Sequence, residues 1–372
     1  MDPALQKTLT FLSFILLGFL LKRKFGSQEQ VNGIKNLILT IALPSTIFVA
    51  LMGVEINANM LVLPVLALAF NFLIYFLTPL LLKLIGVEGD SAKGRTLKLL
   101  LPSLAPGLSC FPFILEYLGE NSLADAALAD VGNKFFVLIF LYVMAMNMFY
   151  RIQGTANKGT RGKLKELFYS LVSEPINIVI VVAVLLLAFG LNFESLPAFM
   201  GDTFSRLSLI MTPLVLFFIG LAVKLNKESM WPIFNVLLVR AGVTMLISTA
   251  LIMLMGPSDT NTILLAIVFP LSSCSFWPFA HLAAFSKREK GTARTFDTEY
   301  AILVLALSLP ISTVLILGIL SSGTFFAQPM VSASAGLLLI GVALVGQLIR
   351  KLSASSFSWG VEESKKLIEQ TD

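Results

Sequence analysis

Two proline-containing segments carry residue types that could bind a ligand. The first, 102–112, reads PSLAPGLSCFP and the second, 270–278, reads PLSSCSFWP. A proline inside a helix removes a backbone hydrogen bond and clashes with the preceding turn. A simple kink is the alternative, but three prolines with Gly107 in eleven residues, mirrored in the second segment, favour a real break in each helix.

A broken helix exposes N–H groups and a positive dipole end, which suit an anion. We therefore expect an anion to bind where the two segments meet, with serine hydroxyls adding hydrogen bonds. For Asn133, simple packing is an equally good interpretation. The predicted substrate-binding residues are Pro106, Gly107, Ser109, Cys110, Pro112, Asn133, Pro270, Ser272, Ser273, Cys274, Ser275 and Pro278. A bulky residue at Ser273 or Gly107 should abolish binding while the protein stays folded.

Four titratable residues inside apolar runs are candidates for ion coupling or charge balancing: Asp130, Lys134, Arg240 and His281. A charge within a membrane costs at least ~2.5 kcal/mol on insertion scales, so each has a functional interpretation. Asp130 and Lys134 are four residues apart and can pair on one helix face, so Lys134 could equally be structural. Arg240 has no acid nearby in its own run, and a structural role is favoured. His281 could carry a coupling proton, although a hydrogen bond within the bundle is the simpler interpretation.

Residue types and motifs that the sequence lacks also limit the functions that it can have. Neither 99–115 nor 261–285 contains Asp or Glu, which favours an anionic substrate and argues against a strong sodium site there. Coupling to H⁺ or Na⁺ stays open. The sequence has no nucleotide-binding loop, metal-ligand cluster or hydrolytic set, so we expect no enzyme activity, cofactor or metal. The net charge of +5 reflects membrane topology and does not indicate nucleic-acid binding.

Composition indicates the elements that must position these residues. The chain is 56% apolar and 13% charged, whereas soluble domains carry about 25% charged residues. Eleven apolar runs are long enough to cross a membrane as helices. They lie near 5–21, 33–52, 60–84, 98–118, 123–150, 175–191, 204–223, 231–255, 261–285, 297–320 and 331–350.

Basic residues gather in alternate loops, for example Lys22–Lys24 and Arg151–Lys165, while the other loops are mostly acidic. Cytoplasmic loops are rich in Lys and Arg, which predicts an outside N-terminus and a cytoplasmic C-terminus. The basic cluster follows the first apolar run, so this run is not expected to be a cleaved signal peptide. We predict a multi-pass protein of the plasma membrane, which is the inner membrane if the source is a bacterium.

Prolines recur at a nearly constant offset along the chain. Pro44 and Pro213 are 169 positions apart, and Pro102 and Pro270 are 168 apart. Five spans per copy is an odd number, so the second copy would enter the membrane from the opposite side. The predicted fold is an all-α polytopic membrane protein with an inverted repeat of five plus five transmembrane helices, broken and crossing helices 4 and 9, and an extra C-terminal helix. The predicted divisions are a first repeat at 1–150, a cytoplasmic linker at 151–173, a second repeat at 174–320, an extra helix at 321–351 and a cytoplasmic tail at 352–372.

Four stretches of the chain resemble the auxin efflux carrier family, within the bile-acid/auxin/arsenite transporter superfamily. They are LILTIALPSTIFVAL, FILEYLGENSLADAAL, SEPINIVIVVAVLLLAFGLN and LIMTPLVLFFIGLAV. The resemblance implies a scaffold built from the first two helices of each repeat and a transport domain built from the other three. It also implies an X-shaped crossover of the broken helices. Ala105-Pro106 and Phe269-Pro270 stand where plant-type members often have Asn-Pro.

The sequence thus predicts a secondary transporter of a small organic anion that works by alternating access and is surrounded by membrane lipid. A homodimer is one option for its assembly. The alternative is a membrane sensor or regulator that keeps the carrier fold and binds a ligand without transporting it. Uptake into proteoliposomes distinguishes the two, since a sensor binds its ligand without accumulating it.

Overall fold

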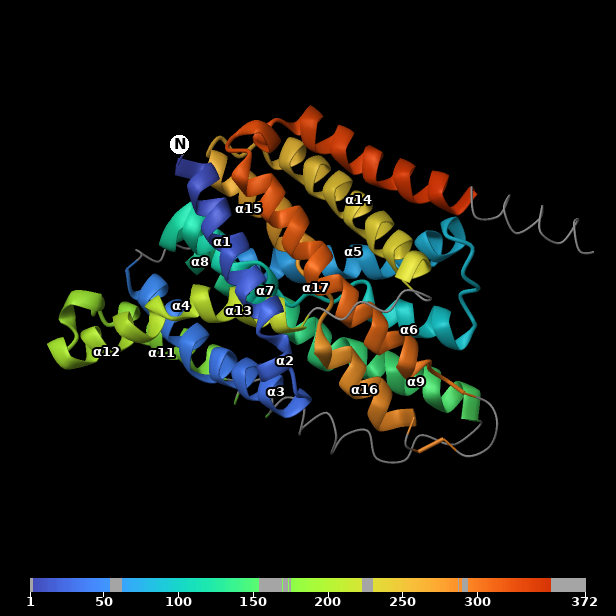
Figure 1. Ribbon diagram of the computed structural model, residues 1–372, viewed down its shortest axis with the longest axis horizontal. Coiled ribbons are helices and arrows are strands. Elements are labelled where there is room, and N and C mark those ends of the chain that lie inside the picture. The colour runs from blue at the N-terminus through green and yellow to red at the C-terminus, as the bar shows by residue number, and fades with distance from the viewer. Residues whose placement is uncertain are drawn as a thin grey trace, which may run out of the picture.

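The computed structural model describes residues 3–53, 62–153, 169, 173, 175–222, 230–286, 288–289 and 294–348. Within these ranges every regular element is a helix (Figure 1). Among the helices of the described residues, eight are long and apolar enough to cross a membrane, and Leu9–Leu20 and Pro175–Ala188 are shorter apolar helices. The prediction of an all-helical, multi-pass membrane protein is confirmed. Most of the predicted linker 151–173 and the whole tail 352–372 lie outside the described residues.

The described residues of the first half of the chain form nine α-helices and two π-helical turns. They are α1 (Pro3–Leu20), α2 (Lys22–Phe25), α3 (Gln28–Leu37), η1 (Ile38–Ala42), α4 (Leu43–Met52), α5 (Leu63–Leu84), α6 (Ala92–Leu100), α7 (Pro106–Ser109), α8 (Phe111–Phe135), η3 (Phe136–Phe140) and α9 (Leu141–Gln153). Gly119 has φ 87° and divides α8 into two helical parts. A side chain is strained at this φ, so glycine fits the turn.

The second half has the same kind of long and interrupted helices. They are α11 (Pro175–Ala188), η4 (Phe193–Ser195), α12 (Ala198–Leu209), α13 (Met211–Ala222), α14 (Met230–Met255), α15 (Thr260–Val268), η5 (Phe269–Leu271), α16 (Phe276–Ser286), α17 (Thr298–Ser321), η6 (Phe325–Ala327) and the C-terminal helix Pro329–Leu348. The helices follow the predicted apolar runs closely. The inverted relation of the two halves and the domain divisions stay predictions.

Both predicted helix breaks are present. We call residues 101–105, between α6 and α7, the first break, and residues 272–275, between η5 and α16, the second break. Pro106 begins α7 and Pro112 lies in the first turn of α8, where a missing N–H costs no helical hydrogen bond. The two breaks lie side by side, because the Ala105 N–H donates to the Ser273 carbonyl at 2.8 Å.

Glycines let α1 and α13 approach backbone to backbone. A Cβ added at Gly18 would lie 2.2 Å from the Phe217 oxygen, and one added at Gly220 would lie 2.1 Å from the Ile15 oxygen. In membranes, where apolar lipid gives helices little reason to associate, such small-residue contacts provide much of the packing. This pair of helices joins the start of the chain to its second half.

Replacing Gly220 by alanine should therefore destabilise the protein. We expect a loss of about 1–3 kcal/mol, the usual cost of overpacking, because backbone atoms of α1 must move. The measurement is the thermal unfolding midpoint of the purified protein. Gly33→Ala on α3 is the matched control, since nothing lies within 4 Å of its added Cβ. Equal midpoints for the two variants would contradict the close packing of α1 against α13.

Candidate functional site

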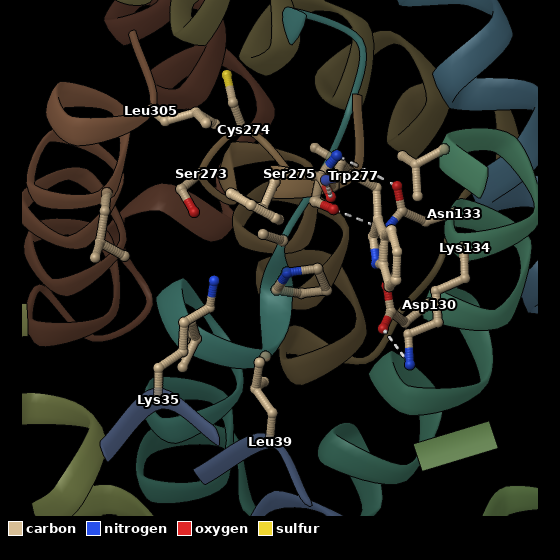
Figure 2. Close-up of a pocket in the computed structure, with 18 of the residues that line it drawn as sticks. Lys35, Leu39, Asp130, Asn133, Lys134, Ser273, Cys274, Ser275, Trp277 and Leu305 are labelled. Carbon is tan, nitrogen blue, oxygen red and sulfur yellow. Dashed lines mark hydrogen bonds and ion pairs between the residues drawn. The ribbon is translucent and has the colours of Figure 1, made fainter. Parts of the chain in front are cut away.

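A cavity of about 350 Å³ lies beside the two breaks (Figure 2). Its walls come from both halves of the chain, including α3, α8, α13 and α17. Most of the lining is apolar. The lining residues are Lys35, Leu39, Leu104, Ala105, Pro106, Gly107, Leu108, Asp130, Asn133, Lys134, Val137, Ile176, Phe218, Ala222, Ser273, Cys274, Ser275, Phe276, Trp277, Leu305, Ala306 and Leu309.

Asn133 anchors the first break to α8 and α5. Its Nδ2 donates to the Leu104 carbonyl at 3.0 Å and to Asp130 Oδ1 at 2.7 Å. Its Oδ1 accepts from the Leu104 N–H at 3.3 Å and from Asn71 Nδ2 at 3.0 Å. An asparagine amide has two donors and two acceptor positions, and all four are used here. Asn133 therefore holds the wall of the cavity, and has no position left for a substrate in this conformation.

Asp130 and Lys134 form the ion pair that their spacing predicts. The Lys134 Nζ lies 3.5 Å from Asp130 Oδ2, and both side chains are buried. Lys134 also lies 3.4 Å from Asn177 Oδ1 on α11. The carboxylate of Asp130 is thus bonded by both Asn133 and Lys134. Figure 2 shows Asp130, Asn133 and Lys134 together on one wall.

Serine hydroxyls satisfy the backbone of the second break. The Ser273 N–H donates to Ser109 Oγ at 2.9 Å, and the Ser275 N–H donates to Ser103 Oγ at 3.0 Å. Ser109 also donates to the Ala105 carbonyl. These N–H groups were expected to hold an anion; in this conformation both donate to serine hydroxyls of the first half of the chain, and anion binding at the breaks stays a prediction. The freed backbone groups of a broken helix need partners inside a membrane, and the serines supply them.

Two polar groups of the cavity remain available. Among the described residues, nothing hydrogen-bonds to the Ser273 hydroxyl, which is 4% exposed and points into the cavity in Figure 2. Lys35 lies on the facing wall, with its Nζ 4.5 Å from the centre of the Phe276 ring. Lys35 lies near the start of the predicted apolar run 33–52 and was not among the predicted site residues. It was missed because α3 continues without interruption into the apolar run, so that Lys35 faces the bundle.

Arg240 links the two breaks without touching the cavity. It lies on α14, is 4% exposed, and donates from Nε to the Leu101 carbonyl at 2.7 Å. One terminal nitrogen donates to the carbonyls of Ser103 at 3.2 Å and Ser272 at 2.9 Å. Carbonyls left unpaired at helix C-termini carry partial negative charge, which explains why a cation is stable here. The favoured structural interpretation of Arg240 fits this geometry.

The remaining predicted residues divide into two groups. Pro106, Gly107, Cys274 and Ser275 line the cavity. Those that do not line it are Ser109, Cys110, Pro112, Pro270, Ser272, Pro278, Arg240 and His281.

His281 is buried and lies with its Nε2 3.0 Å from the Val137 carbonyl, packed against the Tyr142 ring. A coupling role for His281 gains no support from this position.

Comparison with known proteins gives one informative similarity. The chain is 25% identical over 221 residues to an uncharacterized transporter, MJ1031, of Methanocaldococcus jannaschii. The match covers 58% of this chain and 67% of that protein. No family model matches the chain. The similarity and the multi-pass helical structure support a transporter in general, and the likeness to auxin efflux carriers stays a resemblance.

Proposed function

We propose that the chain is a secondary transporter that moves a small organic anion across the plasma membrane by alternating access. The cavity beside the breaks is the proposed substrate site. The main support for the proposal is the set of charged and polar side chains in that cavity that are available to a ligand. Lys35 offers a cation and Ser273 a hydroxyl, whereas the carboxylate of Asp130 is already bonded to Asn133 and Lys134. An anion would find donors here, and a cation would find no uncommitted carboxylate.

The apolar walls of the cavity favour a substrate that is itself partly apolar. Phe218, Leu305 and Leu309 are typical of this lining. Burial of apolar surface contributes roughly 25 cal/mol per Å², and binding pockets usually combine apolar walls with a few polar groups that fix orientation. A volume of about 350 Å³ suits a small molecule. The ammonium groups of Lys35 and Lys134 and the carboxylate of Asp130 together leave one net positive charge in the cavity. We therefore infer that the substrate is a monoanion with an apolar portion.

Uptake into proteoliposomes tests the proposal. The purified chain is reconstituted and offered radiolabelled monocarboxylates with apolar bodies, with and without gradients of H⁺ and Na⁺. We expect saturable uptake of at least one anion and none in a Ser273→Phe variant, whose side chain fills the site. Accumulation of an organic cation, with no anion transported, would overturn the proposal.

A non-transporting ligand sensor is the second candidate. The bonded Asn133 and the three contacts of Arg240 would suit a rigid receptor as well as a carrier. The same proteoliposomes separate the two functions, because a sensor binds the anion and raises its own thermal stability without accumulating the ligand. Binding without uptake, at every gradient tested, would favour the sensor.

Lys35→Gln should weaken anion binding with little effect on folding. A hydrogen bond to a charged group contributes about 1.5–3 kcal/mol, so we expect roughly 10- to 100-fold weaker apparent affinity. The measurement is the substrate concentration at half-maximal uptake. Lys24→Gln on α2 is the control, because Lys24 is exposed and lies over Phe25, away from the cavity. An unchanged affinity for Lys35→Gln would remove Lys35 from the site.

A further inference from the structure

A second cavity, of about 270 Å³, lies between α5, α8, α14 and α15. Its lining is apolar apart from Asp125 and Thr262, and it contains no Lys or Arg. Phe269 and Pro270, which lead into the second break, form part of the wall. Leu104 of the first break lines this cavity as well as the first one. Apart from Leu104, the residues that line the second cavity lie outside the proposed substrate site and its polar network.

Asp125 is the exceptional residue of this cavity. Its side chain is half-buried on α8, five residues before Asp130. Among the described residues, no side chain or backbone group donates a hydrogen bond to it and no cation pairs with it. The charged group that acts on it electrostatically is another carboxylate, Asp259. Even a half-buried carboxylate without a partner loses part of its hydration, and a cation placed in the cavity would offset this loss.

The cavity opens toward the outer surface of the helix bundle. Leu66 and Met255 line it and are exposed, so in a membrane they would face lipid. A ligand that enters between them must dissolve in the membrane, and it must carry positive charge to match Asp125. Amphipathic amines, which combine an ammonium group with an apolar body, have both properties.

We propose that the second cavity is a separate binding site for a small amphipathic organic cation, whose ammonium group pairs with Asp125 and whose apolar body packs against Leu251, Leu265 and Phe269. This site is independent of the proposed anion site, and a ligand in it contacts the segment that leads into the second break. Binding here can therefore be measured without knowledge of the transported substrate.

Direct binding to the full chain in nanodiscs of zwitterionic lipid tests the site. The probe is 2-phenylethylammonium, with 2-phenylethanol as the neutral molecule of similar shape. We expect saturable binding of the amine, and roughly 10- to 100-fold weaker binding of the alcohol, from the loss of a charged hydrogen bond. Asp125→Asn should weaken amine binding by a similar factor while leaving alcohol binding unchanged.

Asp259→Asn is the matched control for charge. Asp259 caps α15 through Oδ2, which accepts from the Thr262 N–H and hydroxyl at 2.8 Å each, and asparagine is an equally good cap. The Thr262 N–H and then its hydroxyl lower the pKa of Asp259, so it is charged at neutral pH but lies outside the lining. We expect amine binding within about twofold of wild type for this variant, since exposed charges interact weakly.

A second variant tests the cavity itself. Ala129→Phe places a ring inside the lining and should abolish binding of both probes, while the thermal unfolding midpoint reports whether the protein is folded. Equal binding of amine and alcohol would show a lipid-like apolar groove and overturn the proposal. Amine binding that survives Asp125→Asn would overturn it too.

Discussion

Replacing Arg240 by methionine is expected to destabilise the protein severely and to abolish transport. Methionine keeps much of the apolar stem but leaves the carbonyls of Leu101, Ser103 and Ser272 without their donor. Each buried acceptor left unpaired costs about 1–3 kcal/mol, so a loss of at least ~3 kcal/mol is expected. The measurement is the free energy of unfolding by denaturing detergent, together with uptake into proteoliposomes.

Two further variants serve as comparisons for Arg240→Met. Arg240→Lys keeps the charge, but the single ammonium group of lysine lacks the planar set of donors with which the guanidinium reaches all three carbonyls. We therefore expect an intermediate loss of stability. Arg206→Met on α12 removes an exposed arginine and should change the unfolding free energy by less than about 0.5 kcal/mol. A stable, transporting Arg240→Met variant would show that the two breaks hold together without it.

The breaks could be predicted from the sequence because proline acts locally. A proline weakens the helix around it locally, and the structure has interruptions beside Pro106, Pro112 and Pro270. The clustering of these prolines carried the prediction, since α5 and α17 continue through the single prolines Pro79 and Pro310. The ion pair of Asp130 and Lys134 was predictable for the same reason, since its spacing is fixed within one helix.

The assignment of donors and acceptors could not be predicted in the same way. Whether Ser273 or Ser109 faces a ligand depends on which backbone N–H lies opposite, and that partner comes from the other break. The sequence shows which residues carry hydroxyls, but not which of these hydroxyls accept hydrogen bonds from the backbone of the two breaks. Lys35 is a similar case, because its place over Phe276 depends on packing between segments far apart in the chain. Such contacts follow from the tertiary arrangement alone.

The pair of Asp130 and Lys134 has two roles that a single substitution cannot separate. Lys134→Met should cost about 3–5 kcal/mol, because it leaves a buried carboxylate without its cation. Uptake would also fall, but loss of folding alone could explain that. Lys98→Met provides a matched control at an ion pair of 3.7 Å whose carboxylate is 76% exposed. We expect that control to cost less than about 1 kcal/mol.

A neutral double variant separates stability from transport. In Asp130→Asn/Lys134→Met the unpaired charge is gone, and asparagine can still accept from Asn133, so most of the lost stability should return. Lys35 still leaves one positive charge in the cavity of this variant, as in the wild type, so we expect uptake to return together with stability. Stability without uptake would show that Lys134 itself contacts the anion. The measurement is uptake per correctly folded protein in the wild type, the single variant and the double variant. If uptake recovers together with stability, the pair only holds α8 in place, and the anion is attracted by Lys35 and Ser273.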